Sequence, residues 1–258
     1  MVLADLTAGA VEDAARRAET LPLAVVERAA LARTAAKDAR AALAPAARVK
    51  IIAEVKRSSP SRGALADIPD PAHQAALYET GGASAISVLT EERRFGGSLA
   101  DLEAVTARVA LPVLRKDFIA TPYQVFEARA AGADLALLIV AGLEAAVLRE
   151  LFDLTTQLGM TPLVETHSAD ELERAIDLGA PLIGVNARNL KTLELDRDLF
   201  ARLVDRIPAD AVKIAESAVL TPEDVARYRS AGADVVLIGE ALVTGDPVAT
   251  LTSFLEVG

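Results

Sequence analysis

Charged and amide side chains stand at the ends of several short apolar runs in this 258-residue chain. A buried strand tolerates a charged group at its end only where that end opens onto water or a ligand. Lysines and glutamates that meet in one pocket can carry out general acid–base chemistry, because each charge shifts the pKa values of its neighbours. The candidate groups are Glu54, Lys56, Lys116, Glu165, Asn186, Arg188 and Glu216.

Side-chain alternation along the first run predicts which way these groups point. Successive side chains of a strand face opposite sides, so Glu54 and Lys56 share one face with Ile52, while residues 51, 53 and 55 form a wholly apolar face. In a barrel the apolar face packs against helices, which directs Glu54 and Lys56 inward. The same parity directs the other candidates inward. So many ionisable groups must pair with each other, with water or with a ligand, and this pattern favours an active site over a plug of ion pairs.

The elements that must position these groups are short β-rich runs that alternate with helix-length segments. We count eight runs, near residues 51, 86, 113, 137, 163, 183, 214 and 237, each followed by apolar residues at three- and four-residue spacing. This pattern predicts an α/β fold, a (β/α)8 TIM barrel over residues 49–258. The alternative is a doubly wound open sheet, but that fold usually carries a Gly-rich turn after its first strand, which residues 57–61 do not form.

Residues 1–48 precede the first run and are predicted to form an N-terminal helical extension packed on the barrel. Two helix-like stretches are expected there, near residues 9–19 and 23–42. The N-termini of two later helices are predicted at Asp70-Pro71 and Thr221-Pro222, because each pair places a capping side chain before a proline. We expect the whole chain, residues 1–258, to form a single domain.

The composition excludes several classes of site and partner. The chain has no cysteine, which excludes disulfides, zinc–thiolate sites and cysteine nucleophiles. A formal net charge of −10 without a basic stripe disfavours nucleic-acid and anionic membrane partners, although cations focused in a cleft can still bind an anionic substrate. The start of the chain lacks a signal-peptide pattern, and its longest apolar stretch, residues 135–143, is too short to span a bilayer. We therefore expect a cytoplasmic protein.

The strand-end residues resemble the motifs of the indole-3-glycerol phosphate synthase family. The most specific strings are Glu54-Val55-Lys56-Arg57-Ser58-Ser59-Pro60-Ser61 and Arg115-Lys116-Asp117-Phe118. They are joined by Phe95-Gly96-Gly97-Ser98, Leu163-Val164-Glu165, Asn186-Ala187-Arg188-Asn189-Leu190, Ala215-Glu216-Ser217 and Ile238-Gly239-Glu240, in order from the first run to the last. The family also has extra N-terminal helices, which residues 1–48 match.

The resemblance implies a carbon–carbon lyase, a carboxy-lyase of tryptophan biosynthesis. Its substrate, 1-(2-carboxyphenylamino)-1-deoxyribulose 5-phosphate, closes a ring and loses carbon dioxide and water to give indole-3-glycerol phosphate. No metal or organic cofactor is implied.

On this resemblance the catalytic residues are Lys116, Glu165, Lys56, Glu54, Glu216 and Asn186. Lys116 matches the general acid, and we expect desolvation to lower its pKa toward a useful range. Glu165 matches a catalytic carboxylate and Lys56 a catalytic or binding lysine, while Glu54 and Glu216 would orient and tune the lysines. Family mechanisms differ on which lysine serves which step, so that division stays open.

The resemblance also implies the residues that hold the substrate. Asn186 and Arg188 match positions that hold the substrate's carboxylate or shape its pocket, and the phosphate is expected at the loops after the seventh and eighth strands. The substrate-binding residues are Arg188, Ser59, Pro60, Phe95, Phe118, Leu137, Leu190, Ser217, Ala218, Leu237, Gly239 and Glu240. Ala218 departs from the family's usual Glu-Ser-Gly. With a negative φ it would still donate its N–H, so we expect a weakened or shifted phosphate contact and not a lost one.

Other functions stay open at this point. A Schiff-base aldolase would use Lys116 as its nucleophile. The departure at Ala218 from the family pattern gives some support to a non-catalytic phosphate-binding barrel. Phosphoribosylanthranilate isomerase is a weaker alternative, because the Glu-x-Lys and Arg-Lys-Asp-Phe strings do not belong to it. His167 and His73 receive no catalytic role, since a lone histidine is more often a surface or loop residue. We expect a monomer or a weak homo-oligomer that binds a small phosphorylated substrate.

Overall fold

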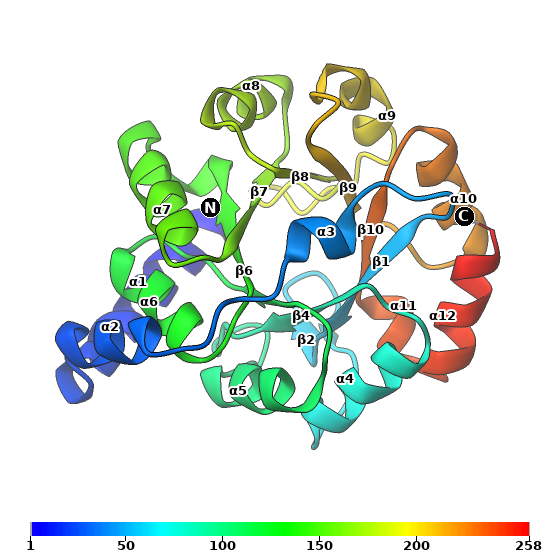
Figure 1. The fold of residues 1–258 in the computed structure, drawn as a ribbon. Helices are drawn as coiled ribbons and strands as arrows, with labels where there is room; N and C mark the ends of the chain where they lie inside the picture. The colour runs from blue at the N-terminus through cyan, green and yellow to red at the C-terminus, as the bar shows by residue number, and fades with distance from the viewer. Residues whose placement is uncertain (1, 258) are drawn as a thin grey trace.

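The chain forms a closed parallel barrel ringed by helices (Figure 1). The computed structural model describes residues 2–257, and within them eight parallel strands pair around the ring in the order β1-β10-β9-β8-β7-β6-β5-β4. These strands are β1 (Lys50–Val55), β4 (Ala85–Leu89), β5 (Val113–Lys116), β6 (Leu135–Ile139), β7 (Thr161–Thr166), β8 (Leu182–Asn186), β9 (Val212–Glu216) and β10 (Val235–Ile238). The predicted (β/α)8 barrel is confirmed, and the closed ring rules out the doubly wound sheet.

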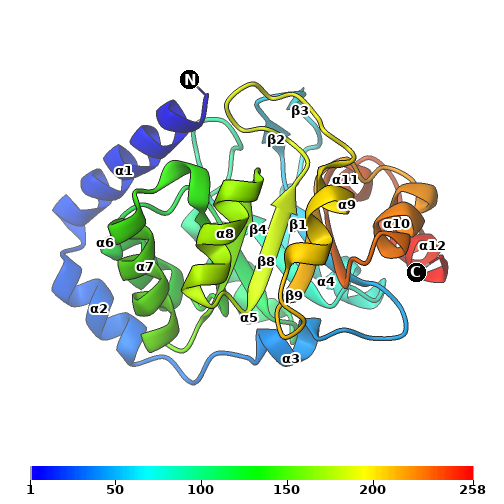
Figure 2. The ribbon, with the colours of Figure 1, turned by 90° about the horizontal axis from the view of Figure 1, so that it is seen from above.

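Helices follow the strands and cover the outside of the barrel (Figures 1 and 2). They are α4 (Pro71–Thr80), α5 (Leu99–Arg108), α6 (Pro122–Ala130), α7 (Ala145–Gln157), α8 (Ala169–Leu178), α9 (Leu199–Leu203), α10 (Pro222–Ser230), α11 (Glu240–Val243) and α12 (Pro247–Glu256), with 3-10 turns η1 (Val140–Gly142) and η2 (Val204–Arg206). The two predicted helix starts are confirmed: Asp70 caps α4 and Thr221 caps α10, each followed by proline. Over residues 2–257, none of the helices has the length and apolar character needed to cross a bilayer.

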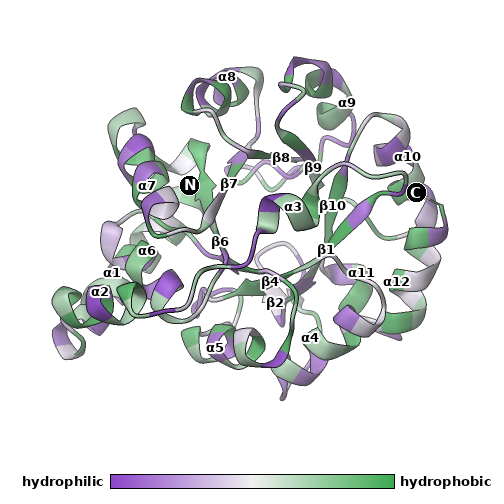
Figure 3. Cartoon of the chain, viewed as in Figure 1, coloured by the Kyte–Doolittle hydropathy of each residue, from purple (hydrophilic) through white to green (hydrophobic). Residues whose placement is uncertain are grey.

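The core has two layers, one on each face of the strands. Ile51, Ala53 and Val55 of β1 pack in the outer layer with apolar residues of the helices. Ile52 packs inside the barrel, together with Leu114 and other inward residues. This confirms the facing predicted for the first strand. Hydrophobic colour accordingly dominates the strands in Figure 3, whereas the hydrophilic residues are mostly on helices and loops.

The N-terminal extension differs in part from the expectation. Its first helix, α1 (Val2–Thr20), confirms the stretch near residues 9–19. The stretch 23–42 was wrongly predicted as one helix, because it divides into α2 (Leu23–Leu31) and α3 (Ala39–Leu43). Between them the backbone N–H of Lys37 donates to Asp134 at 2.8 Å, and the Lys37 ammonium donates to two backbone carbonyls after α5. These tertiary contacts outweigh the helix propensity of the segment.

A buried polar cluster ties α1 to β5 through α6. Arg115 points outward from β5, is fully buried, and donates to Thr90 Oγ1 at 3.1 Å and to Asp117 at 2.9 Å. Its other amino group lies 3.4 Å from Glu127 of α6. Arg17 of α1 reaches the same Glu127 with two hydrogen bonds, at 2.6 and 2.8 Å. The strand that carries Lys116 is thus held from outside by charges on α6 and α1.

The loop after β1 crosses the mouth of the barrel. It contains a short hairpin of β2 (Ser58–Ser59) and β3 (Gly63–Ala64), which lies at the carboxyl end of the strands and opposite α3 (Figure 2). Active sites of such barrels lie at this end.

Candidate active site

A cavity of about 400 Å³ opens at the carboxyl ends of the barrel strands. Every residue to which the sequence assigned a catalytic or substrate-binding role lines this cavity: Glu54, Lys56, Ser59, Pro60, Phe95, Lys116, Phe118, Leu137, Glu165, Asn186, Arg188, Leu190, Glu216, Ser217, Ala218, Leu237, Gly239 and Glu240. The inward parity of the barrel strands brings the strand residues among them to one place, and the loops that follow the strands bring the others.

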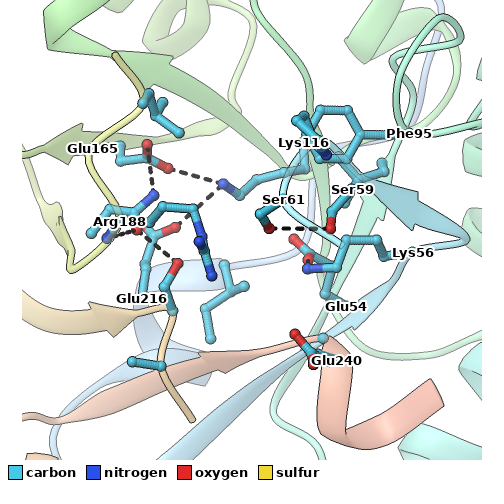
Figure 4. Close-up of a pocket in the computed structure, with 18 of the residues that line it drawn as sticks. Glu54, Lys56, Ser59, Ser61, Phe95, Lys116, Glu165, Arg188, Glu216 and Glu240 are labelled. Carbon is cyan, nitrogen blue, oxygen red and sulfur yellow. Dashed lines mark hydrogen bonds and ion pairs between the residues drawn. The ribbon is translucent and has the colours of Figure 1, made fainter. Parts of the chain in front are cut away.

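Lys116 lies between two buried carboxylates (Figure 4). Its Nζ is 2.9 Å from Oε2 of Glu165 and 3.3 Å from Oε2 of Glu216. Lys116 and Glu216 end β5 and β9, and Glu165 is the second-last residue of β7. The side chain of Lys116 is 14% exposed. A Cβ at Gly184 of β8 would clash with Glu216, so glycine there makes room for this carboxylate between the strands.

Each ionisable group of this cluster shifts the pKa values of the others. Burial alone would lower the pKa of Lys116, but the carboxylates of Glu165, Glu216 and Glu54 outweigh burial and raise it. The predicted lowering of this pKa by desolvation is therefore wrong. Burial also opposes ionisation of Glu165, yet the charge of Lys116 and the contact with His167 hold the pKa of Glu165 well below its ordinary value.

Glu216 responds in the opposite direction. Burial, and then repulsion by Glu165, raise the pKa of Glu216 to about 8, although Lys116 pulls the other way. At neutral pH the cluster therefore holds an ammonium at Lys116, a carboxylate at Glu165 and a carboxylic acid at Glu216. Two carboxyl groups with separated pKa values can divide the roles of base and acid.

Lys56 and Glu54 form a second ion pair on β1, with 2.7 Å between Nζ and Oε1. A Cβ at Gly239 would lie 2.7 Å from Glu54 Oε1 and 2.9 Å from Lys56 Nζ. Glycine at this position thus leaves space for the pair. Gly239 is also the N-cap residue of α11.

Asn186 links the carboxylate cluster to the neighbouring loops. Its Nδ2 donates to Oε1 of Glu165 at 3.1 Å. Its Oδ1 accepts from the backbone N–H of Arg188 at 2.9 Å and from the hydroxyl of Ser217 at 2.8 Å. These contacts fix the orientation of the amide and place its donor on Glu165.

Apolar residues form the other part of the cavity wall. The rings of Phe95 and Phe118 lie 6.1 Å apart, centre to centre, at an interplanar angle of 41°. Phe95, Leu190 and Leu137 pack in the same apolar cluster as the barrel interior. The cavity wall thus offers both charged and apolar groups, which suits a ligand with an aromatic ring and ionic groups.

A sequence model described as indole-3-glycerol phosphate synthase matches residues 3–254. The chain belongs to the indole-3-glycerol phosphate synthase family. The indole-3-glycerol phosphate synthase of Leifsonia xyli subsp. xyli is 70% identical over 99% of this chain and 98% of its own length. That of Beutenbergia cavernae is 58% identical over 100% of this chain and 96% of its own length.

Solved structures of low sequence identity share the barrel fold. The N-acetylmannosamine-6-phosphate 2-epimerase of Clostridium perfringens is 17% identical with a TM-score of 0.60, covering 75% of this chain and 87% of its own. The thiamine phosphate pyrophosphorylase of Pyrococcus furiosus is 13% identical with a TM-score of 0.59, covering 84% and 96%. At these identities the likeness concerns the fold alone.

Ala218 is where this chain departs from the usual pattern of the synthase family. Its φ is +57° and that of Ser217 is +69°, so both residues adopt the left-handed conformation. The negative φ that we considered for Ala218 is therefore wrong. The loop keeps a backbone conformation that glycine adopts without strain, and alanine occupies it at a cost.

Several residues around this synthase-family site were not found from the sequence. Leu6 of α1 lines the cavity, and Arg62 of the β2–β3 hairpin lies 2.7 Å from Glu240 at the start of α11. His167 lies against Glu165. The apolar periodicity of α1 indicates a buried face but not what it covers, and the other two contacts depend on loop conformations that no local pattern encodes.

Proposed function

We propose that this cavity catalyses the ring closure of 1-(2-carboxyphenylamino)-1-deoxyribulose 5-phosphate to indole-3-glycerol phosphate, with release of carbon dioxide and water. The observation that carries the proposal is the Lys116–Glu165–Glu216 cluster at the strand ends of a chain that belongs to this synthase family. The cluster supplies an acid and a base side by side in a largely enclosed site, as ring closure and dehydration require.

Lys116 is proposed as the general acid of ring closure. The aromatic carbon that bears the carboxylate attacks the ketone carbon, and the ketone oxygen takes a proton from the ammonium as the carbon–carbon bond forms. Carbon dioxide then leaves and the ring regains its aromatic electrons. The raised pKa of Lys116 keeps the group fully protonated at the start of the reaction.

Glu165 is proposed as the partner of Lys116 in proton transfer. Its low pKa makes it a base at neutral pH, and its 2.9 Å contact with Nζ gives a path for returning a proton to Lys116. The hydroxyl formed by ring closure must leave as water while a proton is removed to complete the indole. Glu165, Glu216 in its acid form and Lys56 are the groups proposed for this dehydration, with Glu54 orienting Lys56.

The remaining residues are proposed to hold the substrate. Phe95, Phe118, Pro60, Leu137, Leu190 and Leu237 would wall the aromatic ring, and Arg188 with Asn186 would meet its carboxylate. The phosphate is proposed to lie near Ser59 and at the loops after β9 and β10, where Ser217, Ala218, Gly239 and Glu240 line the cavity.

A Schiff-base aldolase is disfavoured by the state of Lys116. An imine forms only from a neutral amine, whereas the carboxylate of Glu165, 2.9 Å from Nζ, raises the pKa of Lys116 and keeps it charged. A barrel that merely binds phosphate would have no use for a buried lysine held between two carboxyl groups.

The test is turnover of the anilino-ribulose phosphate by the purified chain, followed by the absorbance and fluorescence of the indole product. We expect turnover by the natural sequence, and a loss of kcat of about 10²–10⁴-fold in Lys116→Met, the range for removal of a general acid. Lys191→Met makes the same exchange at an exposed loop position and should keep the natural kcat. A folded natural protein that forms no indole product would refute the function, and an active Lys116→Met variant would refute the role of Lys116.

We also propose that the chain acts as a single domain in the cytoplasm, as a monomer or weak homo-oligomer, with no metal or organic cofactor. Light scattering of the purified protein would measure its mass in solution. Activity after exhaustive dialysis against a chelator would test the metal-free chemistry, and a loss restored by a divalent cation would contradict it.

A further inference from the structure

His167 lies directly behind Glu165, just beyond the end of β7. Its side chain is 7% exposed, and it sits behind the carboxylate instead of among the residues that line the cavity. The next residue, Ser168, caps α8 by accepting from the backbone N–H of Glu171. The turn from β7 into α8 therefore fixes where the imidazole can go.

Both ring nitrogens of His167 face a carboxylate. Nδ1 lies 3.1 Å from Oε2 of Glu171, which also accepts from the backbone N–H of His167 at 2.7 Å. Nε2 lies 3.1 Å from Oε1 of Glu165, but the two are not aligned as a hydrogen bond, and among residues 2–257 Nε2 has no other partner. This contact is an ion pair that a small rotation of Glu165 would turn into a hydrogen bond.

The two carboxylates give His167 a positive charge. Burial alone would lower the pKa of His167, but the contacts with Glu165 and then Glu171 outweigh it and raise this pKa to about 9. The charged groups that act on the imidazole are Glu165 of β7 and Glu171 of α8. Glu165 therefore has two cations, Lys116 on the cavity side and His167 on the far side.

We propose that His167 is a positioning residue for Glu165, whose imidazolium keeps this carboxylate ionised and oriented while Lys116 gives up its proton. Lys116 loses its positive charge when its proton moves to the ketone oxygen. At that moment Glu165 would lose its nearest counter-charge inside a buried site, and a carboxylate left alone there takes up a proton. His167 keeps its own proton throughout and stays as the second counter-charge, so Glu165 remains a base for the next step.

This assignment rests on the proposed function of Glu165, and it predicts kinetics that a purely structural histidine would not produce. In His167→Gln we expect kcat to fall about 10- to 100-fold, the scale of a misplaced catalytic group, with KM nearly unchanged because His167 lies outside the cavity. Loss of the imidazolium raises the pKa of Glu165, so the acidic limb of the kcat–pH profile should move to higher pH. Glu171→Gln should lower kcat less, because it keeps the imidazole.

His73 provides the matched control. It is an exposed residue of α4 and, with His167, one of the two histidines of the chain. His73→Gln should leave kcat and the acidic limb as they are in the natural protein. The NMR spectrum of His73→Gln also assigns the two imidazole signals of the natural protein, since the signal that this variant lacks belongs to His73.

An NMR titration of the imidazole nitrogens tests the charge of His167 without turnover. We expect His167 to titrate near pH 9 and to titrate at lower pH in Glu165→Gln and in Glu171→Gln. A value near the ordinary 6.5 in the natural protein would overturn the assignment. If His167→Gln fails to fold, this titration and the kinetics of Glu171→Gln decide the question.

The outcomes separate this assignment from the proposed function. Turnover by the natural protein, together with a folded His167→Gln variant of unchanged kcat and unmoved acidic limb, would overturn the role of His167 and leave the function standing. A folded natural protein without turnover would overturn the function, and the positioning role of His167 with it.

Discussion

Replacing Lys116 by Met removes the cation that holds the carboxylate cluster together. Its Nζ lies 2.9 Å from the carboxylate of Glu165 and 3.3 Å from the carboxyl group of Glu216, and both groups are buried. Met is an unbranched side chain of similar length, so the exchange removes charge with little loss of packing. Breaking a buried ion pair by removing one partner costs about 3–5 kcal/mol. Glu165 keeps its contacts with Asn186 and His167, so we expect the lower end, about 3 kcal/mol, near neutral pH.

The loss of stability should depend on pH with a definite sign. In the natural protein the pKa of Glu165 is depressed, so this group contributes stability that is present above its unfolded pKa and is lost as pH falls through the lower folded value. Without Lys116 the main cause of that depression is gone, and burial favours the neutral acid. The variant should therefore be most destabilised near neutral pH, and its deficit should shrink as the pH falls toward about 4.

Thermal unfolding across this pH range measures the effect. A loss of about 3 kcal/mol corresponds to a fall in Tm of about 6–12 °C for a chain of this size. Lys191→Met, at an exposed loop position, serves as the control and should keep the natural Tm. A Lys116→Met variant with the natural Tm near neutral pH, or with a deficit that does not change with pH, would refute the reasoning.

Three further changes have expected outcomes. Ala218→Gly should raise the free energy of unfolding by about 0.5–1 kcal/mol. The exchange removes the cost of a left-handed alanine, about 1–2 kcal/mol, but glycine makes the unfolded chain more flexible and so takes back about 0.4–1 kcal/mol. An unchanged or lower Tm would contradict this. Arg115→Leu should cost about 3–5 kcal/mol, measured by urea unfolding, because it leaves the buried Asp117 without its cation and leaves Glu127 with Arg17 alone. A loss below about 1 kcal/mol would mean that the cluster repacks. The natural protein should lose stability as pH rises from about 4.5 to about 8, since in that window folded Glu216 holds a proton that the unfolded chain releases. Glu216→Gln lacks this loss, so its stability relative to the natural protein should increase over the same window. Parallel stability–pH curves for the two proteins would argue against the raised pKa of Glu216.

The barrel and the strand-end groups could be predicted because both follow from short-range rules. Side chains alternate along a strand, so Glu54 and Lys56 share the inward face of β1 with Ile52. Parallel strands of a barrel open at one end, so Lys116 and Glu165 meet there. Neither inference needs the conformation of any loop.

What could not be predicted depends on long-range contacts or on balances between opposing effects. The break between α2 and α3 arises because Lys37 binds Asp134, which is 97 residues away in sequence. The direction of the Lys116 pKa depends on whether burial or nearby carboxylates dominate, and distances decide that. The left-handed Ala218 shows that the loop around it overrides the preference of the residue itself.

The first helix makes the barrel hard to treat as a portable module. Residues 2–20 carry Leu6 to the cavity wall and Arg17 to the buried carboxylate of Glu127. A chain cut at the start of β1 would keep every barrel strand and every ionisable group of the cavity. It would lose Leu6 from the cavity wall and Arg17, which donates two hydrogen bonds to Glu127. Recombination or design that exchanges this barrel between proteins must therefore transfer the helix with it, because the cavity wall includes a residue from outside the barrel itself.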